Sequence, residues 1–141
     1  MTSVKMAITP VTATAPLHYR LAALPVLLIS SVLARRAPLR FTLATARTIK
    51  RIVGRRPASR QRTELVIAAR DWAAARFPGR SACMEASLAA FLLTALTGRA
   101  IDWCIGCRFG PAQSHAWVET GQLPVSEPDT PDRPFHVTIR I

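Results

Sequence analysis

Acidic residues are scarce in this 141-residue chain, and nearly absent from its first half. Eight Asp and Glu stand against 19 Lys and Arg, and residues 1–80 hold only Glu64 and Asp71 against 15 of the basic residues. Residues 81–141 carry a net charge of −2. This asymmetry predicts an anionic partner for the N-terminal part, namely a nucleic acid, a membrane surface or an acidic protein or peptide.

Aromatic residues are also few, and no phosphate-binding loop is present. Aromatics make up 6% of the chain, and Tyr19 is its single tyrosine. Proteins that bind single-stranded nucleic acid stack bases on aromatic side chains, so we expect no nucleic-acid partner. No Gly-rich phosphate loop occurs in the sequence, which argues against bound ATP, and we predict no cofactor.

The sequence has no unbroken apolar run long enough to cross a bilayer. Its main apolar stretch, Leu21–Leu33, has 13 residues and contains Pro25, whereas about 20 residues are needed. It starts late for a signal peptide, and Arg35 and Arg36 follow where a processing site would lie. We therefore expect a helix that is buried or lies on a membrane surface.

Cysteine is too rare, and odd in number, to form a disulfide framework. The three cysteines are Cys83, Cys104 and Cys107. Free thiols are typical of a reducing compartment, so we expect a cytoplasmic protein, with a weak membrane-surface contact through its basic helices.

The hydrophobic pattern divides the chain into three parts. Residues 1–16 lack a period and are predicted to be disordered, 17–58 form a basic helical region, and 59–141 form the core of the fold. We predict an α+β fold, in which N-terminal helices precede a central cysteine-bearing helix packed on a small antiparallel sheet. The expected helices cover residues 17–34, 39–53, 59 or 63 to 77, and 82–97, and the expected strands cover 103–109, 115–120 and 135–141. On the second helix the expected buried stripe is Leu39, Leu43, Ala46, Ile49 and Val53. On the third helix it is Leu65, Ala68, Ala69 and Trp72.

Cys83 is placed as a nucleophile would be. If Ser81 is the N-cap of the central helix, Cys83 lies in its first turn, where unpaired backbone N–H groups and the helix dipole favour a thiolate. The same N–H groups, of Cys83 and Met84, could hold an oxyanion. The competing interpretation is a small buried cysteine on an apolar helix.

His115 opens a predicted strand after a polar loop. At that position it can accept a proton from a thiol, although a surface histidine would give the same pattern. On a strand it shares one face with Trp117 and Glu119. His136, on the last predicted strand, is the fallback base.

A carboxylate that orients the histidine should follow. Glu127 is the first choice, because the third member of a triad fixes the tautomer of the imidazole and stabilises its cationic form. Asp129, Asp132 and Glu119 remain alternatives, and simple solvation explains those that are not used.

Cys104 and Cys107 form a CxxC motif that, with Cys83 and His115, could make a Cys₃His zinc site. The flanking alternation predicts a strand, which points the two cysteines to opposite faces. We therefore predict no metal site, and no redox pair, because the motif does not open a helix.

Taken together, CMEASLAAFLLTALTG, IDWCIGCRFGP and SHAWVETGQLPVSEP resemble the leader peptidases of lasso-peptide biosynthesis. These are B-type proteins of the transglutaminase-like superfamily, which shares a papain-like core, and the stand-alone peptidase of the split form is most similar. The resemblance covers about residues 60–141. It implies a Cys–His–Asp triad, with Cys83 as nucleophile, His115 as base and Glu127 in place of the usual Asp.

The resemblance also implies partners: a precursor peptide with leader and core, a separate leader-binding protein, and an ATP-dependent macrolactam cyclase. The leading hypothesis is a cysteine endopeptidase that removes the leader. An acyltransferase that uses the same site, and a non-enzymatic basic adaptor for a membrane or a nucleic acid, are the rival functions.

Overall fold

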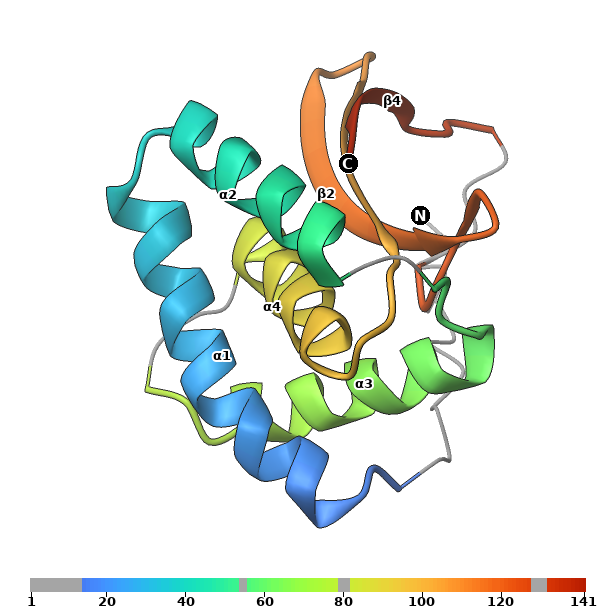
Figure 1. The fold of residues 1–141 in the computed structure, drawn as a ribbon. Coiled ribbons are helices and arrows are strands. Elements are labelled where there is room, and N and C mark those ends of the chain that lie inside the picture. The colour runs from blue at the N-terminus through green and yellow to red at the C-terminus, as the bar shows by residue number, and fades with distance from the viewer. Residues whose placement is uncertain (1–13, 54–55, 79–81, 128–131) are drawn as a thin grey trace.

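The computed structural model describes residues 14–53, 56–78, 82–127 and 132–141 of the chain. Four helices precede a four-stranded antiparallel sheet, which confirms the predicted α+β class (Figure 1). The elements are α1 (Leu17–Arg36), α2 (Leu39–Val53), α3 (Arg60–Ala74), α4 (Cys83–Leu96), β1 (Asp102–Arg108), β2 (Gln113–Thr120), β3 (Leu123–Pro124) and β4 (His136–Arg140).

Helix α4 lies at the centre, with α1 and α2 on one side, α3 below and the sheet on the other side (Figure 1). It is apolar around most of its circumference, as a helix surrounded by protein must be. It ends at Leu96 with Thr97 as its C-cap, and the predicted Gly98 follows with a φ of +76°, a conformation that suits glycine. Its N-cap, however, is Ala82 and not the predicted Ser81, which lies outside the described residues.

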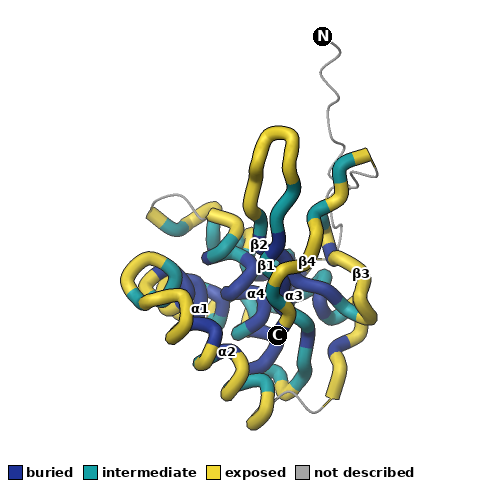
Figure 2. The backbone as a smooth tube through the Cα atoms, turned by 90° about the horizontal axis from the view of Figure 1, so that it is seen from above, coloured by how far each residue is buried: buried dark blue, intermediate teal, exposed yellow. Residues whose placement is uncertain are grey.

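The strand order is β3-β2-β1-β4, and every neighbouring pair is antiparallel. In the long β1–β2 pair, Gly106 lies opposite His115 and Cys104 opposite Trp117. The tip of this hairpin is exposed, whereas the strands become buried as they enter the body of the protein (Figure 2). His115 stands at that transition.

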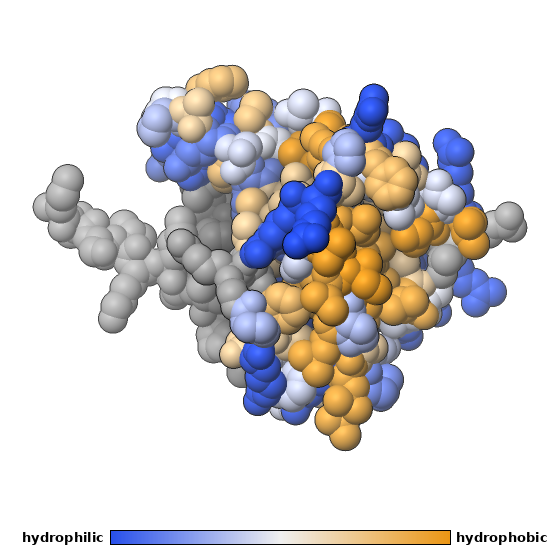
Figure 3. Space-filling model, turned by 90° about the vertical axis from the view of Figure 1, so that its left-hand side faces the viewer, coloured by the Kyte–Doolittle hydropathy of each residue, from blue (hydrophilic) through white to orange (hydrophobic). Residues whose placement is uncertain are grey.

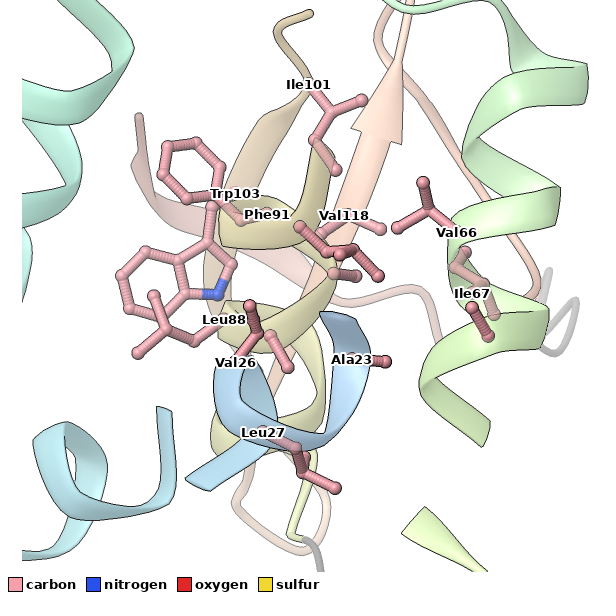
Figure 4. Close-up of a cluster of buried hydrophobic side chains, with 14 of the residues drawn as sticks. Ala23, Val26, Leu27, Val66, Ile67, Leu88, Phe91, Ile101, Trp103 and Val118 are labelled. Carbon is pink, nitrogen blue, oxygen red and sulfur yellow. The ribbon is translucent and has the colours of Figure 1, made fainter. Parts of the chain in front are cut away.

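One hydrophobic core joins all the layers. Side chains from α1, α3, α4 and the sheet meet around Leu88 and Phe91 (Figure 4). The indole N–H of Trp103, which is fully buried, donates to the Ser87 hydroxyl at 2.9 Å, so the largest core side chain has its polar atom paired. Residues on both sides of the predicted boundary at 58/59 contribute to this core, among them Val26, Leu27, Leu43, Val66 and Val118.

Helix α3 has a different buried face from the one predicted. Of the two predicted starting points, 59 and 63, the structure uses the first: Ser59 is the N-cap, and its hydroxyl accepts a hydrogen bond from the Arg62 amide at 3.1 Å. The predicted stripe was wrong in part, because Leu65, Ala68 and Trp72 are only partly buried. The helix carries apolar residues on two adjacent faces, and the face that packs in the core is the neighbour of the predicted one. Its buried residues are Thr63, Val66, Ile67, Ala69 and Ala73.

The first two helices also differ from expectation. Leu39, placed on the buried stripe of α2, is 48% exposed, while Leu43 and Ala46 are buried as predicted. Ala15, assigned to the disordered start, is buried, whereas residues 1–13 lie outside the described part of the chain. Helix α1 continues through Pro25. With 20 residues it has the length and apolar composition of a membrane-spanning helix, a test that some core helices and signal sequences also pass.

Candidate active site

Cys83 is the first residue of α4, and it is exposed. The amides of Cys83 and Met84 lie in the first turn of the helix, where no preceding turn supplies carbonyl acceptors. The thiol and the two predicted oxyanion donors are therefore adjacent at the helix N-terminus.

A tight hairpin brings Glu127 back to His115, although 12 residues separate them. Gly121 and Gln122 both have positive φ, 57° and 65°, which suits a two-residue turn between β2 and β3. The returning chain keeps antiparallel register, and the Val125 amide donates to the Val118 carbonyl at 3.1 Å. This register delivers residue 127 to the start of β2.

The contact is a hydrogen bond of 2.7 Å between His115 Nε2 and Glu127 Oε2. Both side chains are about one quarter exposed, so water screens the pair only in part. The hydrogen bond to Glu127 raises the pKa of His115, while partial burial opposes the rise. The charge of Glu127 and the interaction with the Cys83 side chain raise the His115 pKa further.

The structure thus brings together the three residues singled out in the sequence. Glu127 engages Nε2 of the imidazole, which leaves Nδ1 as the nitrogen that can exchange a proton with the Cys83 thiol. A histidine held by a carboxylate and next to a thiol at a helix N-terminus can form a thiolate–imidazolium pair.

Two aromatic rings fix the plane of the imidazole. His115 stacks on Trp117 with ring centroids 5.8 Å apart, and Phe135 meets it at 5.1 Å from the loop before β4. The Arg108 guanidinium lies 4.3 Å from the Phe135 ring centroid. The residue opposite His115 must be small, because a Cβ on Gly106 would lie 2.7 Å from the Trp117 ring and 2.3 Å from the His136 carbonyl oxygen.

The other face of the α4 N-terminus is tied to α1. Glu85 is buried, and its carboxylate accepts from Arg35 Nε at 2.7 Å and from the Ala82 amide at 2.8 Å. Burial raises the pKa of Glu85, but the hydrogen bonds from Arg35 and Ala82 outweigh it and hold that pKa below its usual range. This pairing fixes the first turn of α4, and hence the position of Cys83, against the end of α1.

The structure describes three of the four alternative residues, namely Glu119, Asp132 and His136. Glu119 is buried and accepts from Trp117 Nε1 at 2.9 Å and from Arg140 at 2.8 Å, away from the imidazole. Asp132 is exposed, and Asp129 lies outside the described residues. His136 is exposed on β4.

The remaining cysteines lie in β1, opposite Trp117 and Ser114 of β2, and the register of β1 with β4 shifts between Ile105 and Gly106. Cys104 is fully buried, and burial raises the pKa of its thiol to about 11. Cys107 lies 3.8 Å from the Thr138 hydroxyl. Within the described ranges, no three His, Cys, Asp or Glu side chains are grouped as metal ligands would be.

Sequence reasoning missed Phe135, Arg108, Glu85 and Arg35 as neighbours of the site. Glu85 carried a usable signal, because an acid three residues after an N-cap position is half of a capping box. Phe135 and Arg108 carried none, since their contacts join segments more than 15 residues apart.

The comparison with protein families identifies the superfamily of the chain. A model of the transglutaminase-like superfamily matches residues 12–140, which include the N-terminal helices as well as the sheet. Neither a curated protein nor a solved structure gives a match. Since the family model spans nearly the whole chain, the protein belongs to the transglutaminase-like superfamily.

Proposed function

We propose that this chain is a cysteine endopeptidase with Cys83, His115 and Glu127 as its catalytic triad. The observation that carries the proposal is the 2.7 Å bond between His115 Nε2 and Glu127, together with the interaction of the same imidazole with Cys83 at the helix N-terminus. The superfamily includes cysteine peptidases and acyltransferases, and the site suits the acyl-enzyme chemistry that both use.

In the first half-reaction the Cys83 thiolate attacks the carbonyl carbon of a peptide bond. The amides of Cys83 and Met84 stabilise the oxyanion. As the C–N bond breaks, the His115 imidazolium gives its proton to the leaving amine, and the acyl group remains on sulfur.

In the second half-reaction a water molecule attacks the thioester carbonyl. His115 takes the proton of that water, the C–S bond breaks, and the thiolate is restored next to the imidazolium. Glu127 keeps the imidazole oriented and stabilises its positive charge through both halves.

The proposed substrate is a ribosomally made precursor peptide, cut between leader and core. This assignment rests on the resemblance of the segments around Cys83, His115 and Glu127 to the leader peptidases of lasso-peptide biosynthesis. The proposal includes a separate leader-binding protein and an ATP-dependent macrolactam cyclase as partners. It places the reaction in the cytoplasm, where free thiols persist.

Cleavage of candidate precursor peptides by the purified chain, with the leader-binding protein present, tests the proposal by mass spectrometry. Cys83→Ala should leave the precursor intact, whereas the matched control Cys107→Ala should cut like the wild type. Cleavage by Cys83→Ala at the wild-type rate would refute the triad. Addition of a primary amine distinguishes the transferase alternative, because an amide product of shifted mass would replace the free carboxylate.

A further inference from the structure

Helix α1 is apolar on two opposite faces, and the described protein covers only one of them. The buried face consists of Ala23, Val26, Leu27, Ser30 and Ser31, which pack toward α3 and α4. The opposite face remains open and carries large side chains with half or more of their surface exposed: Leu17 (64%), Leu21 (54%), Leu28 (53%), Ile29 (53%) and Val32 (50%).

The exposed side chains form a continuous stripe. Leu17, Leu21, Leu28 and Val32 follow one another at intervals of four, seven and four residues, which keeps them on one side of a helix. Figure 3 shows hydrophobic side chains gathered on the face of the molecule where α1 lies, with hydrophilic side chains among and around them. Phe41 and Ile52, 56% and 73% exposed, add apolar surface on α2. Isolated exposed leucines are ordinary, but a stripe along a whole helix marks a contact surface.

The charged side chains on α1 and α2 are all basic. Exposed arginines follow the stripe directly at Arg36 and continue along α2 at Arg40, Arg47 and Arg51. Residues 1–63 of the sequence contain no Asp or Glu. A partner that fits this surface therefore offers an apolar region to the stripe and anionic groups to the arginines beside it.

We propose that α1 lies flat in the surface of an anionic phospholipid bilayer, with its exposed stripe among the acyl chains and the α1–α2 arginines at the headgroups. An apolar helix face with a cationic border is the signature of interfacial helices. A spanning orientation would strip α3 and α4 from its other face and expose the core, so α1 lies along the membrane and does not cross it.

Vesicle co-sedimentation of the full chain tests this proposal. The wild type should sediment with phosphatidylcholine–phosphatidylglycerol vesicles at a 1:1 ratio. Binding to pure phosphatidylcholine vesicles, or to the mixed vesicles at high salt, should be much weaker. The catalytically dead Cys83→Ala chain should bind like the wild type, because this inference does not depend on the proposed peptidase activity.

Two pairs of substitutions separate the contributions. Leu21→Gln with Leu28→Gln should weaken partitioning at least about tenfold by removing apolar contact. The matched control, Leu96→Gln with Leu123→Gln, alters side chains that are 69% and 64% exposed but lie on α4 and β3, and should have little effect.

Arg36→Gln with Arg40→Gln should weaken binding to the mixed vesicles roughly thirtyfold, since each arginine near an anionic surface contributes about a fivefold gain. The matched control is Arg56→Gln with Arg99→Gln, outside α1 and α2. Thermal melts of all four double variants would check that each one folds. Wild-type protein that stays in the supernatant when the anionic vesicles are pelleted would overturn the proposal and favour an acidic protein as the partner. Equal binding by the α1 leucine pair and its control would also overturn it.

Discussion

At one end of β2, His115 meets Glu127, and at the other end Glu119 accepts hydrogen bonds from Trp117 and Arg140. Each end thus pairs a carboxylate with an aromatic nitrogen. The Glu127 side chain is 26% exposed, whereas that of Glu119 is 4% exposed and has two donors. The buried pair is suited to holding strands together, and the accessible pair to exchanging protons with a substrate. Similar pairs at the two ends of one strand therefore differ in role because of what surrounds them.

Removal of the His115 imidazole should have the largest effect on precursor cleavage. His115→Ala should lower kcat/KM for precursor cleavage about a thousandfold, because a general acid–base contributes roughly 10²–10⁴. The control His136→Ala removes the exposed histidine of β4 and should change kcat/KM less than threefold. Equal losses in the two variants would show that the choice of base is wrong.

Loss of the Glu127 charge should have the next largest effect. Glu127→Gln should reduce kcat/KM about a hundredfold and lower the pKa of His115, so the alkaline limb of the pH profile moves to lower pH. Asp132→Asn is the matched control on an exposed acid. An alkaline limb that stays in place would mean that Glu127 does not control the imidazole.

The same variant has a stability consequence with a definite sign. Because the folded-state pKa of His115 is raised, its pairing stabilises the fold below about pH 6.5 and this contribution is lost as pH rises through the folded pKa. The Tm difference between wild type and Glu127→Gln should therefore be larger at pH 6 than at pH 9.

Gly106→Ala should displace the Trp117 ring that stacks on His115. Its Cβ would collide with the Trp117 ring and the His136 carbonyl, so the stack on His115 must move. We expect kcat/KM to fall about tenfold and the free energy of unfolding to fall by about 1–3 kcal/mol. Gly121→Asn serves as control, because that site is open and asparagine tolerates its positive φ. Unchanged kcat/KM in Gly106→Ala would show that the stack does not position the imidazole.

Glu119→Ala should have the smallest effect on cleavage and a clear effect on stability. The buried Trp117 N–H loses its acceptor, which costs about 2 kcal/mol in free energy of unfolding by denaturant titration. We expect kcat/KM at 20 °C to stay within threefold of the wild type. A loss as large as that of Glu127→Gln would erase the distinction between the two ends of β2.

Local sequence patterns predicted much of this structure. The glycine after α4 and the strand segments that became β1 and β2 are set by residues close in the chain. Glu127 was the first choice among four acids, and the structure shows how the short turn at Gly121 brings it to His115.

The remainder depends on contacts between distant segments. Which face of α3 would be buried was decided by α1 and α4, since Leu65 and Val66 are both apolar and the period alone does not choose between them. The Arg35–Glu85 ion pair joins residues 50 positions apart, and the Phe135 ring reaches His115 from 20 residues on. No local pattern encodes such pairs.

The rate of alkylation of Cys83 by iodoacetamide at pH 6 tests the central claim without a known substrate. The thiolate held by the imidazolium should react at least about tenfold faster in the wild type than in His115→Ala, with Glu127→Gln between them. Peptide mapping separates Cys83 from Cys107, and buried Cys104 should stay unlabelled in the folded protein. Equal Cys83 rates in wild type and His115→Ala would contradict the account.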